Sequence, residues 1–455
     1  MLEDTIIAIA TPVGYGGIGI VRLSGDKSLS IAKKIFKPKK KNTRIQPLRP
    51  ILGNLYHFEE KLFFEEAYLI YFPKPSTYTR EDMVEISCHG SPVTLEEVVR
   101  LGKKAGARMA TPGEFTLRAY LRGRIDILQA EAINDFIQAS SFKQAKISFN
   151  QIEGKLSQKM AYFRSQIIQL LSQVEASIEF PEENLRLSTK IISKATGKVI
   201  GSIKRLIESY NLGKTLSEGI ILAITGRANV GKSTLFNSLL ERERAVTSRY
   251  PGTTRDYLKE SIKIKDSIFT LIDMAGIDKP VHPADKEAIK KGGELAAHAD
   301  GILLLLDSAR KESLKDSKLI NKFRDKKMLF LFNKIDLPQK INKNKVKREG
   351  KNHLSLEISA LKGTNLDKLK GMIYELFIPD HRQGEEVILH VRQKLLLEEI
   401  LENLLEGERL LKEGYSEEVY AEQIRKVLPL IGQLTGEIRA DEIIEEIFSR
   451  FCVGK

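Results

Sequence analysis

The chain has 455 residues, 42% of them hydrophobic and 29% charged, which is ordinary for a soluble protein with several cores. The formal net charge of +13 favours a polyanionic partner, although each lysine-rich run, 33–41 and 340–348, could simply be a solvated loop. Two cysteines are too few for a disulfide framework, and no apolar run approaches membrane-spanning length. We therefore expect a cytoplasmic protein that does not enter a membrane.

The first part of the chain, residues 1–119, alternates short β-forming runs with glycine and proline turns. The runs cover residues 5–10, 18–23, 66–72 and 83–87. This pattern predicts an α+β domain.

From about residue 120 the apolar residues recur every three or four positions, as on one face of a helix. Ile152, Leu156, Met160 and Phe163 show this spacing, and a second helix is expected at about 187–210. The same period returns after residue 379. The sequence therefore predicts one all-α domain, made of residues 120–216 and 379–455, that is interrupted by a different domain at 217–378.

The interrupting domain begins with an apolar run that leads into a glycine-bounded loop and then a helix-like segment. Gly226, Gly231, Lys232 and Ser233 have the spacing of a phosphate-binding loop. Its backbone N–H groups are expected to meet phosphate oxygens, while Lys232 supplies positive charge and Ser233 reaches Mg²⁺.

Two later segments complete the expected phosphate site. Asp273 follows an apolar run and can hold Mg²⁺ through water, and the N–H of Gly276 can meet the γ-phosphate. Between them, the polar loop with Thr254 can ligate Mg²⁺ only when the γ-phosphate is present. This loop is expected to act as a switch.

Base choice is expected to come from the segment Asn333-Lys334-Ile335-Asp336, whose last carboxylate can accept hydrogen bonds from guanine N1–H and N2–H. A strand-like segment then leads to Ser359-Ala360-Leu361, which matches the last guanine-contacting loop. Five such segments in order predict an α/β P-loop GTPase domain of the Ras-like kind.

Two features are unusual for a Ras-like enzyme. Ile277 stands where those enzymes carry the glutamine that orients the attacking water. Asn229 lies beside the expected α- and β-phosphates, where its amide oxygen can ligate a monovalent cation. An exposed loop asparagine without such a role is the alternative interpretation.

Several other segments resemble one family over the whole chain. They are Thr111-Pro-Gly-Glu114-Phe-Thr-Leu-Arg118, Asp126-Ile-Leu-Gln129-Ala-Glu131, Phe180-Pro-Glu-Glu183 and Cys452-Val-Gly-Lys455. Together with the interrupted helical domain, they resemble the bacterial tRNA modification GTPases of the MnmE (TrmE) family. The Cys-x-Gly-Lys tail is the most specific of these signs.

The resemblance implies a folate-binding N-terminal domain that also dimerises, and a potassium-activated GTPase. It further implies an FAD-dependent partner of the MnmG (GidA) type, with which the homodimer forms a heterotetramer. The implied reaction adds an aminomethyl or carboxymethylaminomethyl group to the wobble uridine of certain tRNAs, with a methylene carbon from a tetrahydrofolate derivative. FAD belongs to the partner only.

The resemblance also assigns site residues. Folate contacts fall on Arg22, Glu85, Lys455 and Arg124, the last where the family usually has Lys. Potassium ligands fall on Asn229, Ser248, Tyr250 (through its carbonyl) and Thr253. The water-orienting glutamate has no match in register, so Glu287 is the nearest candidate, and Cys452 is a second candidate catalytic residue.

The complete expected nucleotide site gathers the loop residues, the switch and the two base-recognition segments. Its residues are Asn229, Val230, Gly231, Lys232, Ser233, Thr234, Ser248, Arg249, Tyr250, Pro251, Gly252, Thr253, Thr254, Asp273, Met274, Ala275, Gly276, Asn333, Lys334, Ile335, Asp336, Ser359, Ala360 and Leu361.

Two other functions stay open at this point. One is a ribosome-assembly GTPase that binds rRNA, although no RNA-binding module is evident in the sequence. The other is a regulatory switch that only recruits partners. Folate binding by residues 1–119 would distinguish the tRNA-modifying enzyme from both.

Overall fold

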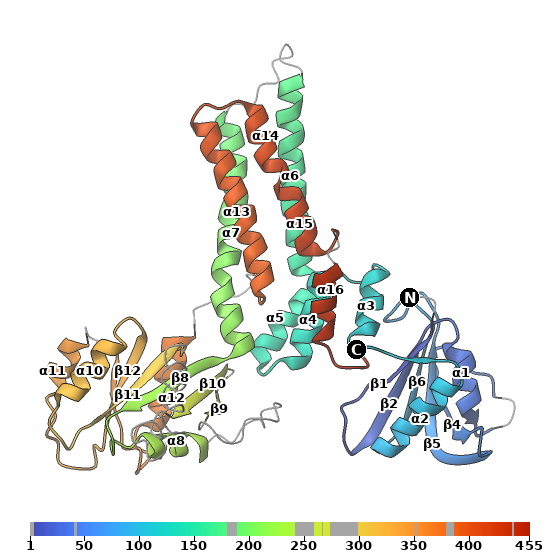
Figure 1. Cartoon of the computed structure of the whole chain (residues 1–455), viewed down its shortest axis with the longest axis horizontal. Coiled ribbons are helices and arrows are strands. Elements are labelled where there is room, and N and C mark those ends of the chain that lie inside the picture. Colours follow the sequence, from blue (N-terminus) through green and yellow to red (C-terminus); the bar gives the residue numbers. More distant parts are fainter. Residues whose placement is uncertain are drawn as a thin grey trace, which may run out of the picture. The chain divides into compact units, whose positions relative to one another are not determined.

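The computed structural model describes residues 4–40, 43–179, 189–241, 259–265, 267–273, 299–350, 353–378, 386–438 and 441–455. By its contacts the chain divides into two compact units (Figure 1). The first contains residues 1–137, 148–200 and 399–455, and the second contains residues 138–147 and 201–398. Within the described ranges, no helix is both long and apolar enough to cross a membrane.

The first unit begins with a mainly antiparallel sheet in the order β3-β4-β5-β6-β2-β1-β7 (Figure 1). The strands alternate buried and partly exposed side chains, most regularly in β4, and helices α1 and α2 pack against the sheet. The strands are β1 (Ile6–Ile9), β2 (Gly16–Ser24), β3 (Phe36–Pro38), β4 (Ile51–His57), β5 (Leu62–Phe72), β6 (Met83–Gly90) and β7 (Arg108–Met109), and the helices are α1 (Ser28–Ile35), α2 (Pro92–Lys104) and α3 (Glu114–Leu121).

The first unit also contains helices from both ends of the predicted helical domain. Helices α14 and α15 pack against α6, and the hydroxyls of Thr196 and Tyr420 are 2.7 Å apart. These helices are α4 (Ile127–Gln138), α5 (Phe142–Ile152), α6 (Lys155–Glu179), α7 (Thr189–Glu218), α13 (Val391–Lys412), α14 (Glu417–Arg425), α15 (Val427–Thr435) and α16 (Asp441–Ser449), with α5, α7 and α13 running into the second unit.

One helix is longer than the sequence predicts. Helix α7 continues past residue 210 to Glu218, because Leu212 and Leu216 are buried in a cluster with Val387 and Leu389. These partners lie about 170 residues away in the sequence, so local periodicity gave no sign of them.

The second unit contains a sheet in the order β13-β12-β11-β8-β10-β9, in which only the β9–β10 pair is antiparallel. Strands β8, β11 and β12 are nearly continuous apolar runs, as expected for strands covered on both faces. The elements are β8 (Ile220–Gly226), α8 (Lys232–Glu241), β9 (Lys259–Ile264), β10 (Ser267–Asp273), β11 (Gly301–Asp307), α10 (Leu314–Lys322), β12 (Lys327–Asn333), α11 (Lys343–Glu349), β13 (Ser355–Glu357) and α12 (Leu366–Phe377). The predicted fold class, an α+β domain with a helical domain interrupted by an α/β P-loop domain, is confirmed.

Candidate functional site

The phosphate-binding loop follows β8 and leads directly into α8. Its backbone has positive φ at Gly226 (151°), Asn229 (62°) and Gly231 (99°), and a Cβ at Gly231 would collide with the Asn333 amide. The Lys232 ammonium is buried and donates to the carbonyls of Gly226 (2.8 Å) and Arg227 (3.0 Å). The loop therefore wraps around a positive charge at the N-terminus of a helix, which suits a phosphate group.

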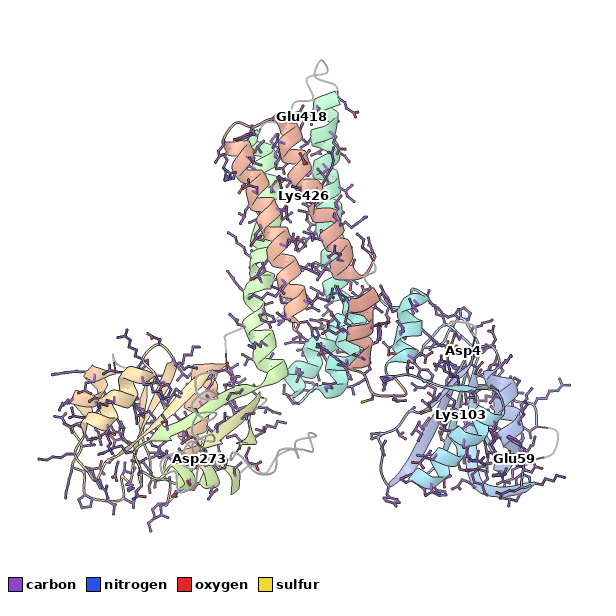
Figure 2. All side chains as sticks on the ribbon, in the orientation of Figure 1. Asp4, Glu59, Lys103, Asp273, Glu418 and Lys426 are labelled. Carbon is purple, nitrogen blue, oxygen red and sulfur yellow. The ribbon has the colours of Figure 1, made fainter. Side chains whose placement is uncertain are left out.

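Asp273, labelled in Figure 2, is the last residue of β10. This strand pairs in parallel with β8, so that the aspartate is opposite Ile224. Its side chain is buried. Because the carboxyl ends of parallel strands meet at one edge of a sheet, Asp273 and the loop that follows Gly226 lie at the same edge.

Asn333 connects the phosphate-binding loop to the last guanine-recognition segment. Its side-chain amide donates to the Val230 carbonyl (2.8 Å) and accepts from the Ala360 N–H (2.9 Å). The Ser359 hydroxyl donates to Asp336 (2.5 Å) and lowers the pKa of that carboxyl. The structure thus brings together three segments that the sequence proposed for one nucleotide.

Asp307 is a contributor that the sequence reasoning missed. This buried residue ends β11 opposite Asn333, and its carboxylate lies 2.8 Å from the Lys334 ammonium. The same ammonium donates to the Asn229 carbonyl (2.7 Å), so the ion pair fixes the loop at Asn229. An acid at the end of the run Gly301–Asp307 was the available signal, since Asp273 ends β10 in the same way.

Part of the predicted nucleotide site lies outside the described residues. This part includes the switch residues 248–254, residues 274–276 and the candidate Glu287. Of the metal ligands proposed, Ser233 for Mg²⁺ and Asn229 for K⁺ are described; Asn229 lies in the loop before Lys232, and Ser233 lies in the first turn of α8. Thr254, Ser248, Tyr250 and Thr253 remain predictions from sequence.

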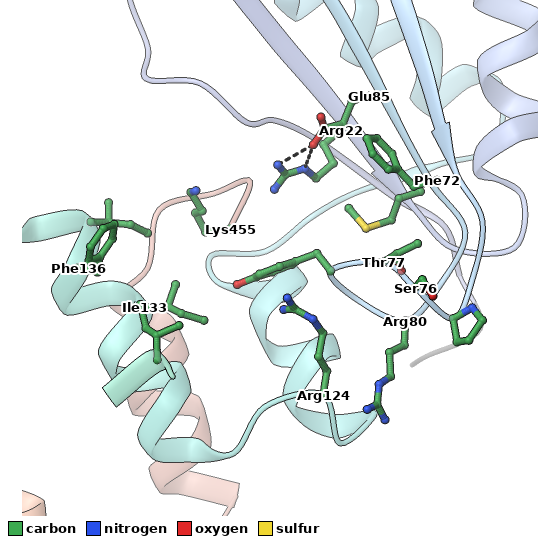
Figure 3. Close-up of a pocket in the computed structure, with 15 residues that line it drawn as sticks. Arg22, Phe72, Ser76, Thr77, Arg80, Glu85, Arg124, Ile133, Phe136 and Lys455 are labelled. Carbon is green, nitrogen blue, oxygen red and sulfur yellow. Dashed lines mark hydrogen bonds and ion pairs between the residues drawn. The ribbon is translucent and has the colours of Figure 1, made fainter. Parts of the chain in front are cut away.

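The first unit contains a pocket of about 700 Å³ (Figure 3). All four predicted folate residues, Arg22, Glu85, Arg124 and Lys455, line it, although they come from four separate parts of the chain. The apolar part of the wall includes Phe72, Met83, Ile133, Phe136, Ile137 and Ile152. A cavity of this size with apolar walls and a few charged groups is typical of a site for a small organic molecule.

On one side of the pocket, Arg22 and Glu85 form an ion pair between neighbouring strands (Figure 3). The Arg22 guanidinium donates to Glu85 Oε1 at 2.8 Å through Nε, and its Nη2 lies 2.7 Å from the same oxygen. Both bonds use one oxygen, so Oε2 can accept from a ligand. Burial, with the nearby positive charge of Arg22, lowers the pKa of Lys455.

Figure 3 places two further cations, Arg80 and Arg124, on the other side of the pocket. The Arg124 guanidinium lies over the Tyr78 ring, 4.7 Å from its centroid, and Arg80 donates to the Arg122 carbonyl (2.7 Å). Tyr78 and Arg80 were not predicted from the sequence, because neither belongs to a recognisable motif.

Residues 452–455 reach the pocket because their backbone is attached to α3. The Phe115 N–H donates to the Lys455 carbonyl (3.1 Å) and the Gly113 N–H to the Cys452 carbonyl (3.4 Å). Gly454 has φ of 97°, and a Cβ there would collide with the Ile9 carbonyl oxygen. Cys452 itself is exposed.

Arg118, in the Thr111–Arg118 segment, has a structural role. Its guanidinium is 1% exposed and contacts Glu114 (2.9 Å), Glu81 (3.1 Å) and Asp4 (2.6 Å). Arg118 therefore connects α3 to the chain before β1 and to the segment before β6. The second of these segments lines part of the pocket, so the ion pairs stabilise that part.

Comparison with known proteins covers the whole chain. The model of the TrmE N-terminal domain matches residues 5–124, and that of the MnmE helical domain matches residues 127–452. The tRNA modification GTPases MnmE of a Thermoanaerobacter species, of Acetivibrio thermocellus and of Aquifex aeolicus are 38%, 36% and 37% identical. Each alignment covers 100% of this chain, and 100%, 99% and 100% of the respective relative.

A solved structure is similar over a smaller part. A tyrosine-to-alanine variant of Aquifex aeolicus Era, bound to GDP and AlF4⁻, aligns with 41% of this chain and 66% of its own, at 25% identity and a TM-score of 0.29. A likeness of that size does not bear on function. The full-length identities and both domain models show that the chain belongs to the MnmE (TrmE) family of tRNA modification GTPases.

Proposed function

We propose that this protein hydrolyses GTP during the modification of C5 of the wobble uridine in certain tRNAs. The group added is carboxymethylaminomethyl or aminomethyl, and its methylene carbon comes from a tetrahydrofolate derivative. The protein acts as a homodimer with an FAD-dependent partner of the MnmG (GidA) type in a cytoplasmic heterotetramer. The observation that carries this proposal is the pocket that unites Arg22, Glu85, Arg124 and Lys455 in a chain with full-length relatives among tRNA modification GTPases.

At the nucleotide site, the chain's own groups bind and orient GTP. The Asp336 carboxylate accepts the guanine N1–H and N2–H, Lys232 pairs with the phosphates, and Asn333 keeps the base and phosphate segments in register. Ser233 and Thr254 would hold Mg²⁺, and Asn229, Ser248, Tyr250 and Thr253 would hold K⁺. Both ions would neutralise phosphate charge. Glu287 is the candidate for orienting water.

At the pocket, Glu85 accepts hydrogen bonds from the pterin edge, and Arg22 holds the Glu85 carboxylate for this task. Lys455 and Arg124 supply the positive charge that the carboxylates of a folate need. Cys452 is the candidate nucleophile beside the pocket, and its exposure leaves it accessible to a substrate.

Titration calorimetry with 5-formyltetrahydrofolate tests the pocket. We expect Glu85→Gln to weaken binding at least tenfold, because an amide cannot replace a charged acceptor. Glu96→Gln is the matched control, because this residue lies on α2 and does not line the pocket. Equal folate affinity of the wild type and of Glu85→Gln would contradict the assignment.

Mass spectrometry of tRNA nucleosides tests the reaction. A deletion strain should lack the modified wobble uridine, and the full-length chain should restore it. A chain without residues 452–455 should not restore it but should keep its GTP affinity, because the nucleotide residues described lie between Asn229 and Leu361. Full modification by the shortened chain would refute the role of the tail.

A further inference from the structure

The excess positive charge of the chain is concentrated on two helices of the GTPase domain. Residues 311–327, around α10, and 340–350, around α11, contain twelve Lys and Arg residues against four Asp and Glu residues. These 28 residues account for a surplus of eight positive charges out of thirteen in the chain. Both ranges are described in full.

All four acids in these ranges have a nearby partner, Asp325 being 3.7 Å from Arg324. Asp316 is buried and pairs with Arg227 (2.9 Å). Glu312 accepts from the Asn342 N–H (3.0 Å) and lies 3.3 Å from the Lys345 ammonium. Glu349 accepts from the Ser317 hydroxyl (2.7 Å) and so joins α11 to α10. Their charges stabilise the helix pair and offset little of the outward-facing positive charge.

Five of the twelve cations are exposed on the α10 side and at the two ends of α11, whereas Lys326 donates to the Ala299 carbonyl (2.6 Å) and Lys343 pairs with Glu357 (2.8 Å). Lys315, Lys318 and Lys322 are exposed and recur at the spacing of one helix face, whereas Asp316 and Ile320 bury the other face of α10. Lys340 and Arg348 are exposed at α11, which packs beside α10 (Figure 1). We call these five residues, Lys315, Lys318, Lys322, Lys340 and Arg348, the α10–α11 surface.

A recess lies just beyond the end of α10. It has a volume of about 440 Å³, and Arg324, Lys327 and His353 are among the residues that line it. A phosphate or a base that protrudes from a polyanion bound to the α10–α11 surface can enter such a recess.

The chemistry of this surface fits RNA better than a protein. A protein interface needs an apolar core, but within residues 311–327 and 340–350 Leu314 is the sole exposed large hydrophobic residue. Exposed Lys and Arg side chains without such a core are typical of contacts with phosphates, which position a nucleic acid without reading its sequence.

We propose that the α10–α11 surface binds the phosphate backbone of the tRNA substrate. The proposal rests on the proposed function, which supplies the RNA, and it adds the surface that holds it. GTP hydrolysis and RNA positioning then occur on one domain, with separate residues for each.

The test compares two triple variants that remove the same charge. Lys318→Gln/Lys322→Gln/Arg348→Gln alters the α10–α11 surface, and Lys190→Gln/Lys194→Gln/Lys198→Gln alters an exposed stripe on α7. Fluorescence anisotropy with labelled tRNA, at several salt concentrations and with GDP present, gives the affinity and its salt dependence.

We expect the first variant to bind tRNA at least tenfold more weakly and to reduce the slope of log K against log salt by about 2 to 3. The α7 variant should change the affinity less than threefold, and both should bind GTP like the wild type.

An unchanged slope in the first variant, or an equal loss in the α7 variant, would overturn the surface assignment. So would a variant that keeps its tRNA affinity but loses the FAD-dependent partner, because the surface would then be a protein contact. If the wild type itself does not bind tRNA, that result contradicts the proposed function. It can be told apart from the outcomes above, because in each of those the wild type binds tRNA.

Discussion

Gly454→Ala tests whether the short tail completes the pocket. At φ of 97° an alanine is strained by about 1–3 kcal/mol, and its Cβ would collide with the Ile9 carbonyl oxygen and lie 3.2 Å from Ala10 Cα. Ile9 belongs to β1, which pairs with both β2 and β7 and so cannot easily move. We therefore expect residues 452–455, and not β1, to move.

Few hydrogen bonds keep the backbone of residues 452–455 in place against this strain. This backbone accepts three hydrogen bonds, from the Gly113 and Phe115 N–H groups and from Arg22 to the Gly454 carbonyl (3.4 Å), and each contributes about 0.5–1.5 kcal/mol. A strain of similar size therefore releases the tail and removes Lys455 from the pocket. We expect folate affinity to fall about 10- to 100-fold, since 1.4 kcal/mol corresponds to a factor of ten.

Two measurements check this result. Calorimetry gives the affinity for 5-formyltetrahydrofolate, and hydrogen exchange reports the Phe115 amide, which loses its acceptor when the tail leaves. Val453→Ala is the matched control, because Val453 is 42% exposed and is not among the residues with positive φ. Unchanged folate affinity together with unchanged protection of the Phe115 amide would refute the reasoning.

Further predictions concern the nucleotide site and stability. Asp336→Asn should lose its preference for GTP over ATP, measured by competition binding, because an amide cannot accept both guanine N–H groups; equal ATP competition in the wild type would contradict the motif. GTP turnover should be faster in KCl than in NaCl at equal ionic strength, and identical rates would remove Asn229 as a cation ligand. Arg118→Met should lower the free energy of unfolding by about 3–5 kcal/mol in urea titrations, because the buried carboxylates of Glu81 and Glu114 both lose their fully buried cationic partner, whereas Arg122→Met, which removes only a partly exposed partner of Glu81, should cost less. Burial alone raises the pKa of Glu114, but hydrogen bonds from Arg108, Thr111 and Arg118 outweigh it and lower that pKa. The contribution of Glu114 is therefore present above about pH 4.3 and is lost as the pH falls through the lowered pKa, so the unfolding midpoint should drop there.

The sequence by itself determined the features that depend on neighbouring residues. The loop from Gly226 to Ser233 is recognisable because two glycines at a fixed spacing and the lysine that follows them set its backbone and charge. The helical period predicted α6 and the return of helices after residue 379 for the same reason, because the spacing of neighbouring apolar residues defines one face of a helix. The order of the motifs and the tail identified the family.

Only the tertiary structure decided which distant residues meet. Asp307 reaches Lys334 because β11 and β12 pair in a particular register, and Leu212 extends α7 because Val387 and Leu389 cover it. The pocket combines β2, β6, the segment after α3 and residues 452–455, so Tyr78 and Arg80 gain their places from packing alone. Such contacts depend on strand register and on the burial of remote apolar faces, and the spacing of neighbouring residues does not say which distant segment will be the partner.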